Sequence, residues 1–92
     1  MSRPYELGTA PPAQRALADR LPPEVAVAAA DFITGPLLEN PRRMSKPLGE
    51  ALAGIHAARL GREWRILYEI DESRHLVIVL DILPRSTAYR AR

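Results

Sequence analysis

The strongest constraint on the fold is the run His75–Leu83, which is apolar except at its first residue and at Asp81 and which stops at Pro84. A short, nearly continuous apolar run that ends at a proline is typical of a strand covered on both faces. The preceding stretch, Trp64–Ile70, alternates with a period of two, as a strand with one buried face does. Residues 71–74 separate the two runs, so we predict a β-hairpin.

The alternation within Trp64–Ile70 also assigns side chains to the two faces of this strand. Arg65, Leu67 and Glu69 share one face, and we expect this face to present Arg65 to solvent. The opposite face is apolar and should face the core; it consists of Trp64, Ile66, Tyr68 and Ile70.

Apolar residues at helical spacing precede the hairpin and predict two amphipathic helices, Ala13–Leu21 and Pro23–Glu39. The pair Gly35-Pro36 should kink or end the second helix. The order β-α-α-β-β-β predicts a single α+β domain over residues 1–92, with two helices packed on one face of a curved antiparallel sheet. The other predicted segments are an edge strand at Pro4–Leu7, a basic loop at Arg42–Pro47, a strand at Ile55–Leu60 and a tail at Arg85–Arg92.

Composition narrows the classes of protein to which the chain can belong. Cysteine is absent, which excludes disulfides and thiolate metal sites and agrees with a reducing compartment. No apolar run approaches the roughly 20 residues of a membrane helix, and Met1–Tyr5 lacks the apolar segment of a secretory signal. We therefore expect a soluble cytoplasmic protein with no membrane association and no cofactor.

Charge is distributed unevenly along the chain. Residues 1–40 carry three arginines and five acidic residues, whereas residues 41–92 carry nine arginines, one lysine and six acidic residues. The net charge of +2 therefore divides into −2 and +4. Arginine binds phosphate in a bidentate manner and stacks on bases better than lysine does. The basic half contains the hairpin, so we predict an anionic partner for that half.

Arginine and tyrosine occur together just after the hairpin, in the sequence Arg85-Ser86-Thr87-Ala88-Tyr89-Arg90. An arginine fork holds phosphate and a tyrosine ring stacks on a base, so Arg65, Arg85 and Tyr89 are candidate residues of a nucleotide site. Other interpretations stay open for each of them. In these alternatives, Arg65 is a surface residue that pairs with Glu69, Arg85 is a solubilising charge near the chain end, and Tyr89 packs the tail against the sheet.

Three segments carry a family resemblance. Gly35–Arg43, followed by Lys46-Pro47-Leu48, is similar to the end of the second helix and the basic loop of actinobacterial toxins. Gly54–Tyr68 is similar to a Leu-x-Gly-(Leu/Ile)…Arg…Gly-x-(Tyr/Trp)-Arg-(Val/Ile)-x-Tyr hairpin, and Arg85–Arg90 matches an Arg-x-x-x-Tyr-Arg ending. In this order the segments resemble the RelE/ParE superfamily of bacterial toxins, specifically its RelE-like mRNA interferases.

The resemblance implies the toxin of a type II toxin–antitoxin system, an endoribonuclease that cleaves mRNA in the ribosomal A site and inhibits translation. It implies a cognate antitoxin and the ribosome with its mRNA as partners, and a toxin–antitoxin hetero-oligomer. The implied reaction uses no metal, because the 2′-hydroxyl attacks the adjacent phosphate. Arg65 and Arg85 would stabilise that phosphate, and Tyr89 would stack on a base or move a proton.

Further cations are candidate RNA contacts rather than catalytic groups. Relatives carry basic residues in the strand before Arg65, where this chain has His56 and Arg59. Histidine titrates near neutral pH and is suited to moving a proton, although a lone histidine is more often structural. The remaining predicted RNA-binding residues are Arg43, Lys46, Arg62 and Arg90.

The chain also departs from the family pattern. Many relatives have a histidine or a second basic residue just before the position of Arg85, where Leu83 and Pro84 stand here, and some have lysine where Ala57 and Ala58 stand. No residue of this chain is therefore assigned as the general base. Two alternatives stay open: a ParE-like inhibitor of DNA gyrase, and a degenerate toxin that only binds its antitoxin.

Overall fold

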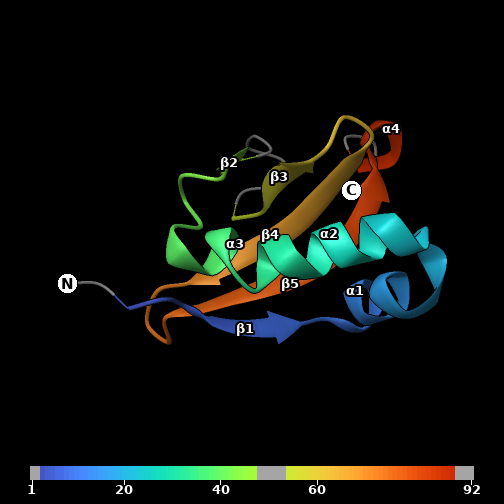
Figure 1. Ribbon diagram of the computed structural model, residues 1–92. Coiled ribbons are helices and arrows are strands. Elements are labelled where there is room, and N and C mark those ends of the chain that lie inside the picture. The colour runs from blue at the N-terminus through green and yellow to red at the C-terminus, as the bar shows by residue number, and fades with distance from the viewer. Residues whose placement is uncertain (1–2, 48–53, 89–92) are drawn as a thin grey trace.

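A central hairpin organises the structure, a computed structural model that describes residues 3–47 and 54–88. Strand β4 (Trp64–Asp71) pairs antiparallel with β5 (Leu76–Pro84), which confirms the predicted hairpin. Among the described residues, five strands form one sheet in the order β1-β5-β4-β3-β2 (Figure 1). The predicted α+β class is confirmed.

The first strand corrects the predicted antiparallel sheet. Strand β1 (Glu6–Thr9) pairs with β5 in the parallel direction, so the sheet is mixed. Backbone hydrogen bonds from Glu6 N to His75 O and from Ala10 N to Val79 O, both 2.8 Å, flank this pairing. A parallel pair requires a long crossover, and the helices between β1 and the hairpin provide it.

The opposite edge of the sheet corrects a second prediction. Strand β3 (His56–Leu60) is confirmed and pairs antiparallel with β4. The segment predicted as a basic loop, however, contains the short strand β2 (Ser45–Pro47), which pairs antiparallel with β3. A three-residue strand that includes a proline is suited to a sheet edge, where one side needs no ladder partner.

Proline begins each of the three α-helices that precede β2. Helix α1 (Pro11–Arg15) continues directly into a π-helical turn, η1 (Ala16–Arg20), and α2 (Pro23–Ile33) is separated from α3 (Pro36–Glu39) at Gly35. A missing backbone N–H is harmless in the first turn of a helix, so proline is tolerated there. The two predicted helices are thus confirmed, with the predicted break. No helix within the described ranges is both long and apolar enough to cross a membrane.

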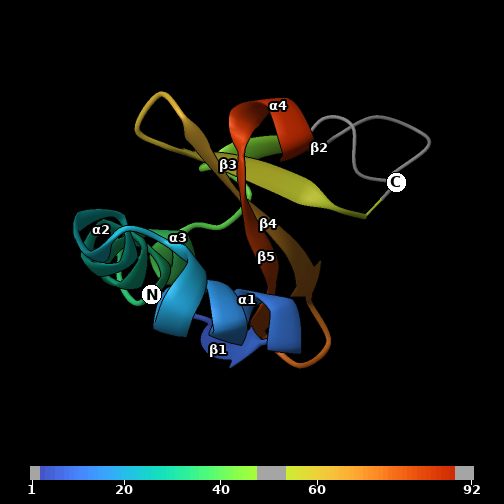
Figure 2. The same cartoon turned by 90° about the vertical axis from the view of Figure 1, so that its right-hand side faces the viewer.

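The core lies between one face of the sheet and these helices, as Figures 1 and 2 show. Alternation places the apolar face of β4 inward, so Ile66 and Tyr68 are fully buried there. The other strands contribute Ala58, Val77, Val79 and Ile82, and the helical segment contributes Ala13, Ala16, Leu21, Ala29, Ile33 and Leu37.

A β-bulge interrupts the central hairpin. Leu67 pairs with Asp81 but Tyr68 pairs with Val79, which leaves Leu80 as an extra residue in β5. Beyond Pro84 the predicted tail begins as a short helix, α4 (Arg85–Ala88), which lies against β4 and β5 (Figure 2). The bulge and α4 together determine where Arg85 leaves the sheet.

Candidate nucleic-acid interface

Two arginines lie directly opposite each other on the face of the sheet that is turned away from the core and from α1, α2 and α3. Arg59 on β3 pairs with Arg65 on β4, so their side chains leave the sheet on the same side. Like charges placed directly across a strand pair destabilise the sheet. A phosphate bound between two such arginines would relieve this repulsion, which makes the pair a candidate anion site.

Arg65 is buried, and the expectation that it is open to solvent is wrong. Only 4% of its surface is exposed, whereas Arg59 is exposed. Nη1 of Arg65 donates hydrogen bonds to the carbonyl oxygens of Trp64 at 2.8 Å and Arg62 at 3.3 Å. These bonds hold the guanidinium against the β3–β4 turn, so its position is largely fixed before any ligand binds.

The β3–β4 turn brings two further arginines to the same end of the sheet. Arg62 is exposed in this turn, and the carbonyl oxygen of Glu63 accepts a 2.7 Å hydrogen bond from the backbone N–H of Arg85. Arg85 is also exposed. The structure therefore gathers four of the predicted residues into what we call the arginine cluster, made up of Arg59, Arg62, Arg65 and Arg85.

The other predicted site residues are not part of this cluster. Arg43 is exposed beyond α3 at the far end of β4, and Lys46 lies on edge strand β2, paired with Ala57. Tyr89 and Arg90 fall outside the described residues, so their assignment stays a prediction.

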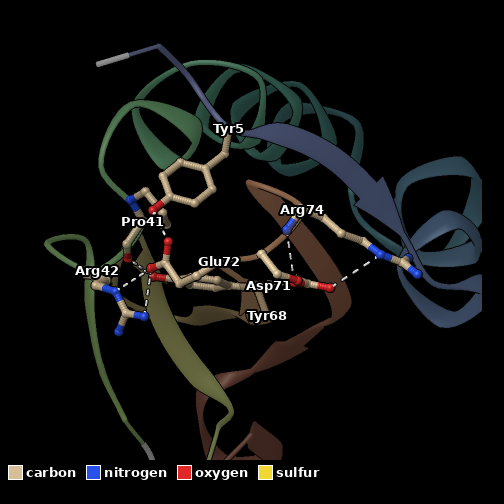
Figure 3. A network of polar contacts seen from close by, with 8 residues as sticks. Tyr5, Pro41, Arg42, Tyr68, Asp71, Glu72 and Arg74 are labelled. Carbon is tan, nitrogen blue, oxygen red and sulfur yellow. Dashed lines mark hydrogen bonds and ion pairs between the residues drawn. The ribbon is translucent and has the colours of Figure 1, made fainter. Parts of the chain in front are cut away.

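The basic segment after α3 contains one arginine with a structural role that the sequence did not reveal. Arg42 Nε donates a 2.7 Å hydrogen bond to the Glu72 carboxylate in the β4–β5 turn, and the Tyr5 hydroxyl donates one of 2.8 Å (Figure 3). The Tyr5 hydroxyl, followed by Arg42, lowers the pKa of Glu72. Because Arg42 is engaged by Glu72, Arg43 is the better candidate for an RNA contact.

His56 lies on the opposite face of the sheet from the arginine cluster. It pairs with Tyr68 and stacks on that ring with 5.4 Å between the ring centroids. Its Nδ1 is buried and has no hydrogen-bond partner among residues 3–47 and 54–88. Burial lowers the pKa of His56, and the nearby Arg42 lowers it further. These surroundings favour a neutral core histidine rather than a group that contacts RNA beside Arg65.

The lowered pKa of His56 predicts a pH-dependent stability. The unfolded chain takes up a proton as the pH falls through about 6.5, whereas folded His56 resists protonation. The free energy of unfolding should therefore fall on acidification below pH 6.5 and level off below the folded pKa. Urea unfolding between pH 5 and 8 checks this, because His56→Gln should flatten the slope. An unchanged slope in His56→Gln would contradict the assignment.

Proteins of known structure share the fold of this chain. No protein-family model matches the chain. The structure resembles the crystal structure of the toxin–antitoxin complex RelBE2 from Mycobacterium tuberculosis with a TM-score of 0.83 and 37% identity, over 90% of this chain and 100% of that one. By fold, therefore, the protein is an α+β protein of the RelE class.

Sequence relatives define the family more closely. Toxin RelE of M. tuberculosis is 44% identical over 87 residues, which cover 95% of this chain and 88% of the relative. Toxin RelG of the same organism is 38% identical over 87 residues, which cover 95% of this chain and 98% of the relative. The chain belongs to the RelE toxin family.

Proposed function

We propose that this protein is the toxin of a type II toxin–antitoxin pair and that it cleaves mRNA in the ribosomal A site. The observation that carries the proposal is the arginine cluster, in which two arginines face each other across β3 and β4. Membership of the RelE toxin family supports the same function.

The proposed reaction consumes only RNA. The 2′-hydroxyl oxygen attacks the adjacent phosphorus, the bond from phosphorus to the 5′ oxygen breaks, and a 2′,3′-cyclic phosphate and a 5′-hydroxyl form. The attacking hydroxyl loses its proton to a base, and the leaving oxygen gains one. Negative charge develops on the phosphorane oxygens during this step, so fixed cationic donors accelerate it.

We assign the stabilisation of this charge to Arg65 and Arg85. The bonds from Arg65 to the Trp64 and Arg62 carbonyls fix one guanidinium, which reduces the reorganisation needed when the phosphorane forms. The bond from Arg85 N to Glu63 O places the second arginine beside the same turn. Arg59 adds electrostatic support, and we assign base stacking or proton movement to Tyr89.

The proposed partners follow from the charge of the cluster. A cytoplasmic antitoxin would cover the arginine cluster with an acidic or amphipathic segment, because binding there neutralises the exposed cations. The RelBE2 structure, which this chain resembles, is a toxin–antitoxin complex. This similarity supports a toxin–antitoxin hetero-oligomer for this chain as well. Ribosomal RNA is the proposed anionic surface for Arg43, Lys46 and Arg62.

Induced expression in bacteria tests the proposed function in cells. Wild-type protein should arrest growth and stop protein synthesis before DNA supercoiling changes, and co-expression of the cognate antitoxin should restore growth. A matched Arg65→Ala culture should keep growing. Loss of supercoiling with intact mRNA would instead support gyrase inhibition, and antitoxin binding without arrest would identify a degenerate toxin.

A further inference from the structure

The π-helical turn η1 lies beside the β-bulge in β5. The π-helical turn η1 ends at Arg20, where the backbone N–H of Leu21 donates a 3.0 Å bond to the carbonyl of Ala16. Opposite this turn lies the β-bulge, at which Leu80 is the extra residue of β5. Both kinds of irregularity are often found next to functional sites, because each re-aims the residues that follow.

An ion pair joins the two irregularities. Nη2 of Arg20 lies 2.5 Å from Oδ1 of Asp81, the residue that follows the bulge, and donates a 2.9 Å hydrogen bond to the carbonyl of Ile82. The same Oδ1 accepts a 2.8 Å bond from the N–H of Ile82. A bulge disrupts the ladder locally, and here the charged pair supplies hydrogen bonds to both backbone groups of Ile82. We call Arg20 and Asp81 the bulge clamp.

The bulge decides which side chains of β5 face the core. Val77, Val79 and Ile82 are fully buried, so the inward positions are spaced by two residues and then by three. Without the extra residue, strict alternation would turn Asp81 inward and move Ile82 to the outer face. Because Leu80 is present as the extra residue, Leu83 pairs with Arg65. Arg85 then lies beside the β3–β4 turn, where its backbone N–H bonds to Glu63.

We propose that Arg20 and Asp81 are positioning residues for the RNA-cleaving site. By holding the bulge, they set the register of the last part of β5, and this register places Arg85 next to Glu63 and the arginine cluster. The inference rests on the proposed function, because it assigns to the clamp the orientation of a group that touches the phosphate. Neither residue belongs to the arginine cluster, and both contact the backbone of Ile82.

The clamp is suited to positioning more than to stability. The side chains of Arg20 and Asp81 are 47% and 23% exposed, so solvent partly screens this ion pair and reduces its contribution to folding. Variants of the clamp should therefore fold, whereas a small displacement of a catalytic group has a large effect on rate. This difference separates the proposal from a purely structural role.

The test compares Arg20→Ala, Asp81→Asn, the double variant and Arg20→Lys with wild type. The single-turnover rate of cleavage of ribosome-bound mRNA should fall by about 10-fold to 100-fold in the first two variants. The half-saturating toxin concentration and antitoxin binding should stay unchanged. The double variant should cleave mRNA as fast as either single variant does, because the two residues act as one unit. Arg20→Lys should cleave faster than Arg20→Ala. Arg74→Ala is the matched control, since Arg74 forms an exposed pair with Asp71 at 3.8 Å far from the cluster.

Hydrogen exchange tests the positioning role of Arg20 and Asp81 without measuring RNA cleavage. Hydrogen exchange of the Arg85 amide, which bonds to Glu63, should speed up by about 10-fold in Arg20→Ala relative to wild type and to Arg74→Ala. Unchanged exchange would overturn the inference even if wild type cleaves no mRNA. Wild-type cleavage rates in both single clamp variants, or a loss of rate that merely follows a loss of folded protein, would overturn it equally.

Discussion

Replacing Arg65 with alanine should reduce the rate of mRNA cleavage by about 10²-fold to 10³-fold, the usual effect of removing one preorganised donor to a developing oxyanion. Arg65 is 4% exposed and donates hydrogen bonds to the carbonyl oxygens of Arg62 and Trp64, so its guanidinium is held in place before a ligand binds. Loss of these bonds should also lower the free energy of unfolding by about 1–3 kcal/mol. Single-turnover cleavage on stalled ribosomes and urea unfolding measure the two effects separately.

Two neighbouring substitutions serve as controls for this effect. Arg65→Lys keeps the charge but not the planar fork, so it should restore stability more than cleavage. Arg59→Ala removes an exposed cation opposite Arg65 and should change stability by no more than about 0.5 kcal/mol, with a smaller loss of activity. Full cleavage by folded Arg65→Ala would contradict the assignment of this arginine to the phosphate.

Replacing Tyr68 with alanine should lower the free energy of unfolding by about 3–5 kcal/mol, the usual cost of truncating a large buried ring. Tyr68 is fully buried in the core and stacks on His56. Its hydroxyl donates a hydrogen bond to the carbonyl oxygen of Pro41 (Figure 3). Domains of this size are stable by about 5–15 kcal/mol, so the variant should be close to unfolding at 37 °C. Thermal and urea unfolding followed by circular dichroism measure this change.

Tyr68→Phe divides the effect into its two parts. It keeps the ring and removes only the hydroxyl, so the loss should be about 1–2 kcal/mol, from the unpaired carbonyl of Pro41. Val27→Ala on α2 is the surface control, because Val27 is 62% exposed and its truncation should cost little. If the phenylalanine and alanine variants lose equal stability, the packing of the ring is not the main contribution.

Periodicity in the sequence was sufficient to predict the central hairpin and the helix pair. The alternation of Trp64–Ile70 and the apolar run His75–Leu83 each extend over enough residues to separate strand from helix. Pro23 and Gly35-Pro36 act locally on the backbone, so the limits of the second helix were also accessible, whereas the first helix begins at Pro11 rather than at the predicted Ala13. These features are local, which is why a single chain reveals them.

Other parts of the fold depend on contacts between distant segments. Neither the parallel direction of β1 nor the pairing of β2 with β3 follows from a local pattern, because each depends on where the chain returns. The β-bulge at Leu80 left a faint signal. Asp81 interrupts an apolar run at a position where strict alternation from Val77 and Val79 would have buried it.

The candidate site was predictable in its composition but not in its geometry. Arg59, Arg65 and Arg85 were all identified from the sequence, and the structure brings them to one end of the sheet. Period-two counting should have separated His56 from Arg59, because an odd interval of three residues places them on opposite faces. The side chain of Arg65 folds back toward the β3–β4 turn and bonds to its carbonyl groups. Alternation along the strand does not indicate this conformation.

The most direct measurement is cleavage of a defined mRNA by purified protein in a reconstituted translation reaction, with 5′ ends mapped to single nucleotides. We expect cuts within the A-site codon only when ribosomes are translating, with 2′,3′-cyclic phosphate ends, and a rate reduced by about 10²-fold or more in Arg65→Ala. Cleavage that does not require ribosomes, or no cleavage by a folded wild-type protein that arrests growth, would contradict a ribosome-dependent mRNA endonuclease.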